Sequence, residues 1–233
     1  MDSITILPRY RGPDDSGNGG YVAGLLASHI DGPAQVRLQS PPPLEAELAI
    51  EERDGSWVML EDGHAVVTGV PCKPLASPPP PPSLAQAEKA RTAYNPQGHP
   101  YGTCFVCGPD RDQGDGLQIF AGAVEGTELV ACNWRPTRDL LDVMGFIEPE
   151  FVWAAMDCPG YFAMKFDGWT QCLLGEISGC IHEDIPGNQD LIVYAWRRGS
   201  EGRKHFAGSA IANGDGKIYA QCEQIWIELP NGT

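Results

Sequence analysis

A nearly continuous apolar segment with one acid at its end constrains this chain more than any other feature. The segment runs from Phe151 to Met156 and is followed by Asp157. Pro149 suits the first position of a helix, where its missing N–H is not needed. A helix that is apolar on all sides must be enclosed by other structure. Asp157 would then be a buried carboxylate, which is costly unless it is paired, hydrogen bonded or used in chemistry.

The length and charge of the chain limit its class. The chain has 233 residues, which suits two small domains. Its net charge of −15 argues against nucleic acid and anionic membranes as partners, since both require basic patches. We find no signal-peptide pattern and no apolar run long enough to span a bilayer. We therefore expect a soluble, cytoplasmic protein whose eight cysteines form no disulfide framework.

Apolar periodicity and turn formers divide the chain into two units and a connector. In the first unit we expect strands at 4–7, 35–39, 45–51, 56–60 and 65–70, and a helix at about 21–29. The connector contains a polyproline stretch, 77–83, and a short helix for which Ser83 and Gln86 predict a capping box. The expected boundaries are 1–72 for the first unit, 73–100 for the linker and 101–233 for the second unit.

The second unit repeats the order of elements with longer strands. We expect a hairpin at 116–124 and 128–133, then the central helix from about 148 to 157 or slightly beyond, and strands at 171–182, 190–197, 204–212 and 218–228. Pro159 and Gly160 are expected to end or kink the helix, because proline cannot continue the hydrogen-bond ladder.

The two expected helices align with each other without a gap. Tyr21 falls on Phe151, Val22 on Val152, and Ala27 on Asp157. Since both halves also share the order of their elements, we interpret them as an internal repeat. One copy has two glycines at the helix start and lacks the acid, whereas the other has the acid and lacks the glycines.

These helix starts resemble those of the hotdog-fold acyl-CoA thioesterases, in the double-hotdog arrangement. Single-domain members often carry His-Gly-Gly at the helix start and an Asp or Glu nine residues after the His. This chain has Asn18 in place of the His, followed by Gly19 and Gly20, and its second half has Asp157 in the acid position. The resemblance implies an α+β protein of two tandem hotdog units, each an antiparallel sheet wrapped around a central helix.

The resemblance also implies a reaction and a site. Each helix start would face the other unit, so that the Gly19 and Gly20 amides lie opposite Asp157 and hold a thioester oxygen. Asp157 would act as general base on water or as nucleophile. Asn18 would orient substrate or water, or simply cap the helix. The implied activity is hydrolysis of an acyl-CoA, or a related acyl thioester, at one complete site per chain without a cofactor, in a homodimer.

Coenzyme A is strongly anionic, so an acidic protein needs a local basic patch to bind it. Arg9 and Arg11 precede the first helix, and Arg197 and Arg198 lie near a predicted turn. Either pair could meet the phosphates, although such arginines are also common on solvated surfaces. Three aromatic residues near the acid suggest a bulky acyl group or ordinary core packing: Trp153, Tyr161 and Phe162.

Other interpretations remain open. Asp157 could cap its helix or pair with a buried arginine. The chain could then be a different hotdog enzyme, such as a dehydratase or tailoring enzyme, or a non-catalytic acyl-CoA or lipid binder. Cys104 and Cys107 form a single Cys-x-x-Cys with His99 five residues before it. Because a structural zinc site needs four ligands, usually in two pairs, we expect no metal site.

Overall fold

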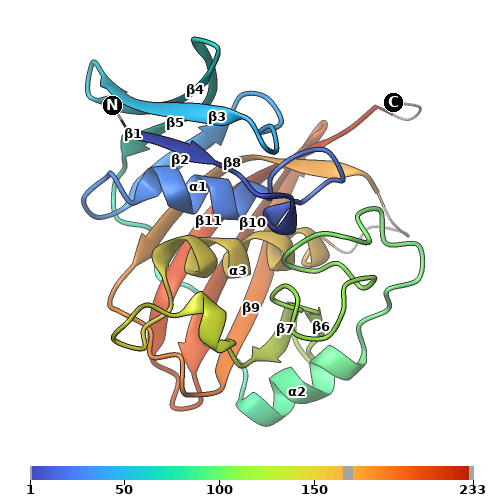
Figure 1. The fold of residues 1–233 in the computed structure, drawn as a ribbon. Coiled ribbons are helices and arrows are strands. Elements are labelled where there is room, and N and C mark those ends of the chain that lie inside the picture. The colour runs from blue at the N-terminus through green and yellow to red at the C-terminus, as the bar shows by residue number, and fades with distance from the viewer. Residues whose placement is uncertain (1, 165–169, 231–233) are drawn as a thin grey trace.

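A computed structural model describes residues 2–164 and 170–230 of the chain. Within them an antiparallel 11-stranded sheet has the order β1-β3-β4-β5-β2-β8-β11-β10-β9-β7-β6 (Figure 1). The strands are β1 (Asp2–Thr5), β2 (Ala34–Leu38), β3 (Glu47–Arg53), β4 (Ser56–Glu61), β5 (His64–Pro71), β6 (Gly122–Ala123), β7 (Leu129–Trp134), β8 (Cys172–Ile181), β9 (Leu191–Glu201), β10 (Lys204–Asn213) and β11 (Ile218–Glu228). The α-helices are α1 (Gly19–Ala27), α2 (Leu84–Thr92) and α3 (Pro149–Phe162).

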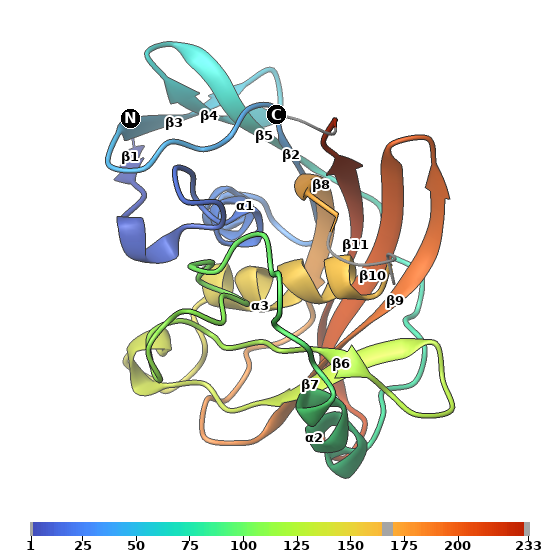
Figure 2. The same cartoon turned by 90° about the vertical axis from the view of Figure 1, so that its right-hand side faces the viewer.

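The sheet joins two halves, each with its own helix. In the order of the sheet, the five strands from β1 to β2 form the first half and cover α1. The six strands from β8 to β6 form the second half and cover α3. The halves meet where β2 pairs with β8, and there Arg37 lies opposite Glu176 and forms an ion pair of 2.7 Å with it. Both helices lie side by side on one face of the sheet (Figures 1 and 2). No helix among the described residues is long and apolar enough to cross a membrane.

Glycines allow α1 and α3 to cross closely. A Cβ atom added to Gly20 would lie 3.2 Å from the Cα of Ala154, and one added to Gly24 would lie 2.6 Å from the Cα of Glu150. In the repeat alignment Gly20 matches Glu150 and Gly24 matches Ala154. The two close contacts are therefore the same contact repeated about a pseudo-two-fold axis, which is what an internal duplication predicts.

The remaining helix, α2, packs on the other face of the sheet. Its Ala87 and Ala90 contact β7 and β9, where Tyr194 points to this second cluster while the neighbouring Val193 belongs to the main core. The hydroxyl of Tyr194 donates to the carbonyl oxygen of Pro79, which fixes the proline-rich segment against the sheet. The expected capping box between Ser83 and Gln86 at the start of this helix is confirmed.

Several expected strands were wrong in extent, among them β3, which covers Glu47–Arg53 rather than 45–51, and β9, which continues to Glu201 rather than ending at 197. The first strand covers Asp2–Thr5 rather than 4–7, because Ile6 turns into the core. Of the expected strand 116–124, only Gly122–Ala123 pairs in the sheet. The preceding residues form backbone hydrogen bonds with a different loop, in which Leu117 N–H donates to the carbonyl oxygen of Phe105 at 2.8 Å.

Helix α3 continues through Pro159 to Phe162, whereas the sequence predicted an end or a kink near this proline. Proline removes one intrahelical hydrogen bond and crowds the preceding turn. A buried side chain from β11 supports the helix at this point. The Nε2 group of Gln224 donates to the carbonyl oxygens of Met156 at 2.7 Å and Asp157 at 3.0 Å.

Candidate active site

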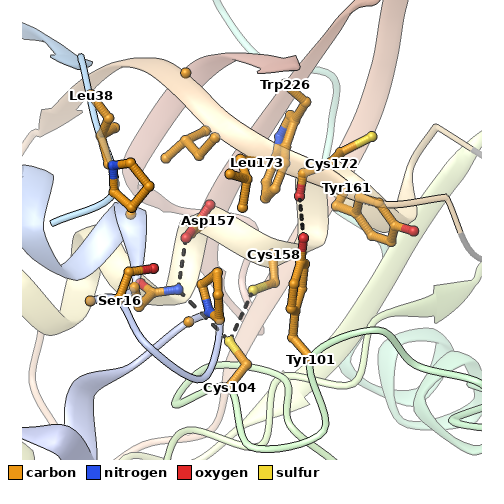
Figure 3. A pocket seen from close by; sticks show the side chains of 18 of the residues that line it. Ser16, Leu38, Tyr101, Cys104, Asp157, Cys158, Tyr161, Cys172, Leu173 and Trp226 are labelled. Atoms are coloured by element: carbon orange, nitrogen blue, oxygen red, sulfur yellow. Dashed lines mark hydrogen bonds between the residues drawn. The ribbon is translucent and has the colours of Figure 1, made fainter. Parts of the chain in front are cut away.

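Asp157 is buried at the contact between the two helices, with 2% of its surface exposed. Its Oδ2 atom accepts hydrogen bonds from the Asn18 Nδ2 group at 2.8 Å and from the Gly20 N–H at 3.0 Å. Its Oδ1 atom is also buried and has no hydrogen-bond partner among the described residues. One oxygen is thus fixed by the first half of the chain, while the other is turned away from Asn18 (Figure 3).

The start of α1 is built to hold this carboxylate. The Oδ1 atom of Asn18 accepts the N–H of Tyr21 at 2.9 Å, so Asn18 is the N-cap and its amide group faces Asp157. A Cβ atom at Gly20 would lie 2.6 Å from the Cβ of Asp157. Only glycine at position 20 allows the amide to approach the carboxylate so closely.

Gly19 retains an available amide at the same helix start. As the first residue of α1, it has no intrahelical acceptor for its N–H. Among the described residues this N–H has no other hydrogen-bond partner, and Gly19 lines the cavity beside Asp157. Of the two glycines expected to hold a substrate oxygen, Gly20 instead uses its N–H on Asp157.

Burial raises the pKa of the Asp157 carboxyl to about 7, because removal from water disfavours its charged form. The hydrogen bonds from Gly20 and Asn18 oppose this shift. A carboxyl group with a pKa near neutrality is present in both forms, which suits the transfer of a proton.

A cavity of about 230 Å³ lies beside Asp157. Both halves line it, through the loop before α1, the end of β2, residues 99–107, α3, β8 and the end of β11. Its walls are mainly apolar and aromatic, including Tyr101, Tyr161 and Trp226 (Figure 3). Among the described residues that line it, Asp157 is the only carboxylate and none is a lysine or arginine.

The arginines expected to bind phosphates do not line this cavity. Each has a partner elsewhere: Arg9 pairs with Asp115 and Asp139, Arg11 donates to the Pro8 carbonyl oxygen, Arg197 donates to Ser200, and Arg198 pairs with Glu223. Of the three aromatic residues near the acid, Tyr161 lines the cavity, whereas Trp153 and Phe162 do not.

No family model matches this chain, and no curated protein matches it. Solved structures do match. A tesB protein of Mycobacterium avium subspecies paratuberculosis has a TM-score of 0.61 and 15% identity, over 98% of this chain and 92% of that chain. A hot dog fold protein of unknown function from Alicyclobacillus acidocaldarius has a TM-score of 0.62 and 14% identity, over 98% and 92%. The chain has a double-hotdog fold.

A third solved structure extends the comparison. The acyl-CoA thioesterase II TesB2 from Mycobacterium marinum has a TM-score of 0.61 and 12% identity, over 99% of this chain and 94% of that chain. These matches confirm the expected fold, because each covers both helix-and-sheet halves of the double hotdog.

The pseudo-two-fold axis of the double hotdog relates the site at Asp157 to a second position that carries different residues. Ala27 matches Asp157, so no acid is present there, and Glu150 takes the place of Gly20. Glu150 is half-buried, and burial raises the pKa of its carboxyl. The duplicated fold therefore contains one acid-and-glycine pair, at Asp157 and Gly20.

Sequence analysis missed Gln224, which supports the backbone of Asp157 from β11 and accepts the Trp226 indole N–H at 3.0 Å. A signal was available, because Gln224 lies between Cys222 and Trp226 at every second position and therefore on the same face of the strand as these apolar residues. A glutamine on the inward face of a strand predicts a buried hydrogen-bonding role.

Proposed function

We propose that this double hotdog hydrolyses an acyl thioester to a free acid and a thiol. The observation that carries the proposal is the state of Asp157, whose Oδ2 is fixed by Asn18 and Gly20 while its Oδ1 has no partner. The available amide of Gly19 and an apolar cavity lie beside it. The name of one matching structure, the acyl-CoA thioesterase II TesB2, supports the class of substrate.

The proposed reaction divides the work between the two halves. The thioester carbonyl oxygen accepts a hydrogen bond from the Gly19 N–H. This N–H lies at the N-terminus of α1, where the helix dipole stabilises developing negative charge. Asp157 takes a proton from a water that attacks the carbonyl carbon, or attacks that carbon itself. In the first case the carbon–sulfur bond breaks as the protonated Asp157 returns its proton to the leaving thiolate, and the free acid forms directly. In the second case the thiolate leaves and takes a proton from solvent, and water then hydrolyses the anhydride between Asp157 and the acyl group.

The cavity favours an apolar acyl group carried on a thiol whose charged part stays outside. Its aromatic walls suit apolar chains or rings. Because no lysine or arginine among the described residues lines it, phosphates of coenzyme A would lie beyond the cavity. The name of the acyl-CoA thioesterase II TesB2 structure supports acyl-CoA as the proposed substrate. The arginines named above stay predicted phosphate contacts. The homodimer, the cytoplasmic location and the domain boundaries also stay predictions.

Thiol release from a panel of thioesters tests the proposal. The panel contains short, medium, long and aromatic acyl-CoAs, together with the matching acyl-pantetheines, which lack the nucleotide. We expect turnover of at least one apolar acyl-CoA by the wild type, above the level of an Asp157→Asn blank. Tight binding without turnover on every member would contradict hydrolysis and favour an acyl-CoA binder. Loss of turnover on the pantetheines would show that cations outside the cavity contribute to binding.

Two substitutions of Asn18 separate its structural role from its role at Asp157. Serine keeps the N-cap, whereas alanine removes it, so Asn18→Ala should lower the free energy of unfolding by about 1 kcal/mol more than Asn18→Ser. Both variants lose the amide that donates to Asp157. We therefore expect similar losses of kcat in both, measured by thiol release beside urea unfolding. Full kcat in Asn18→Ser would show that the cap is the only role of Asn18.

A further inference from the structure

Three cysteine thiols converge in the wall of the cavity. Cys104 and Cys107 lie in the loop between α2 and β6, and Cys158 follows Asp157 in α3. All three are buried, and their sulfur atoms lie within 4.8 Å of one another. The contact between Cys104 and Cys158 is visible in Figure 3. The sequence showed the first two as an isolated pair, and the fold adds the third.

The distances match those of a tetrahedral metal site. A Zn–S bond of about 2.3 Å separates two sulfurs in such a site by about 3.8 Å, and a sulfur from a nitrogen by about 3.6 Å. The Sγ atoms of Cys104 and Cys158 are 3.8 Å apart. The Nε2 atom of His99 is 3.4 Å from the Sγ of Cys107. Three thiols from the loop and from α3 thus surround one point, and the imidazole of His99 lies beside them against Cys107.

The loop conformation also fits a Cys-x-x-Cys metal turn. The N–H of Gly108 donates to the carbonyl oxygen of Cys104 at 2.8 Å, which folds the chain back on itself. A Cβ atom at Gly108 would lie 2.5 Å from the backbone of Cys104, so this turn requires glycine. Other buried cysteines, such as Cys132 and Cys222, belong to no such cluster among the described residues.

We propose that Cys104, Cys107 and Cys158 hold a zinc-class metal ion, and that His99 turns from its contact with Cys107 to complete the coordination. Binding through Nε2 places the ring proton on Nδ1, so the Tyr101 N–H that now donates to Nδ1 at 3.0 Å must turn away. The ion would tie the loop that carries Tyr101 to the helix that carries Asp157. This proposal does not depend on thioester hydrolysis, because the metal would hold two segments of the chain together and its binding is measured without turnover.

Metal binding to the untagged, reduced wild-type chain tests the site directly. The chain is stripped with a chelator and titrated with Co²⁺ alone, then with Zn²⁺ as competitor. We expect one equivalent of Co²⁺ per chain, the visible bands of tetrahedral cobalt, and charge-transfer absorption of three thiolates. Zn²⁺ should displace the cobalt and abolish these bands. Elemental analysis of the chain as purified gives a second count of bound metal.

Substitutions identify the ligands. Cys104→Ser and Cys158→Ser should each weaken Co²⁺ binding by more than about 100-fold, since losing an outer-shell partner alone costs about 10–100-fold. Cys132→Ser is the matched control, because Cys132 is equally buried in β7 and should leave binding unchanged. His99→Ala should weaken binding and shift the visible bands while the charge-transfer intensity of three thiolates remains.

Two results would overturn the proposal. One is wild-type binding no tighter than that of Cys158→Ser. The other is a disulfide between two of these cysteines that persists under the reducing conditions, with no metal bound. If the serine variants fail to fold, the wild-type spectrum still decides, because charge-transfer absorption of fewer than three thiolates contradicts the site. None of these measurements depends on turnover, so failure of thioester hydrolysis leaves the metal result readable.

Discussion

Asp157→Asn is expected to lower kcat for thioester hydrolysis by about 10²–10⁴-fold, the usual contribution of a positioned general base. The asparagine oxygen can accept the hydrogen bonds that Asn18 and Gly20 now donate to Oδ2. The NH₂ group then takes the place of Oδ1, where it can neither accept a proton from water nor attack a carbonyl carbon. Thiol release at saturating substrate measures kcat, and circular dichroism verifies the fold.

A second acid on the same helix offers a matched control. Glu150 is half-buried and lies across the pseudo-two-fold axis, but it does not line the cavity. Glu150→Gln removes the same charge and should leave kcat unchanged. If Asp157→Asn retains most of the wild-type kcat, Asp157 is not the reacting carboxylate, and hydrolysis would have to use another group.

Isotope labelling then separates the two roles open to Asp157. If its carboxylate attacks the thioester, an anhydride forms, and water that attacks the carbonyl carbon of Asp157 leaves one of its oxygens there. Repeated turnover in ¹⁸O-labelled water would then label the peptide that contains Asp157, as mass spectrometry can measure. If Asp157 acts on water as a general base, the label enters the acid product alone.

Local signals in the sequence predicted the helices, their alignment and the acid. The apolar segment before Asp157 indicated an enclosed helix, and α3 does begin at Pro149. Helix α1 covers Gly19–Ala27, two residues earlier than the expected 21–29, and its start matches that of α3 in the repeat alignment. The order of strands followed from turn formers and β-branched residues, so the two-unit fold could be predicted before any contact was known. Helix and strand ends shifted because they depend on neighbours outside the segment.

Local sequence patterns could not predict the contacts between segments that are distant in the chain. Asn18 and Asp157 are 139 residues apart, so the sequence could suggest that they face each other but not that Gly20 donates to the carboxylate. The third thiol shows the same limit, since Cys158 lies 54 residues from Cys104. A pair of cysteines is a local pattern, whereas a cluster exists only after folding.

Pro159 shows where a sound local rule gave the wrong extent. Proline disfavours a helix because it removes one hydrogen bond, and Gly160 beside it lowers helix propensity further. The rule does not include Gln224 of β11, whose side chain donates to two carbonyl oxygens of the same turn. Helix α3 continues past Pro159, and these tertiary hydrogen bonds hold the turn before the proline against β11.

This arrangement predicts a large effect for Gly160→Ala. A Cβ atom at this position would lie 1.6 Å from the Oε1 atom of Gln224, which is buried and bonded at both ends of its amide. The alanine must displace Gln224, leaving the buried Trp226 N–H without an acceptor. Overpacking and a lost buried hydrogen bond each cost about 1–3 kcal/mol. We expect the free energy of unfolding in urea to fall by about 3 kcal/mol or more.

A double-mutant cycle with Gln224→Ala tests whether this clash is the cause. Once the glutamine side chain is gone, the new Cβ still lies 3.2 Å from the Cβ of Ala207, a tight contact that a small shift relieves. Alanine also favours a helix over glycine by about 1 kcal/mol. Gly160→Ala should therefore be nearly neutral in the Gln224→Ala background, with a coupling energy of about 2–3 kcal/mol. Additive losses would mean that Gly160 is required by the backbone at Pro159 and not by the approach of β11.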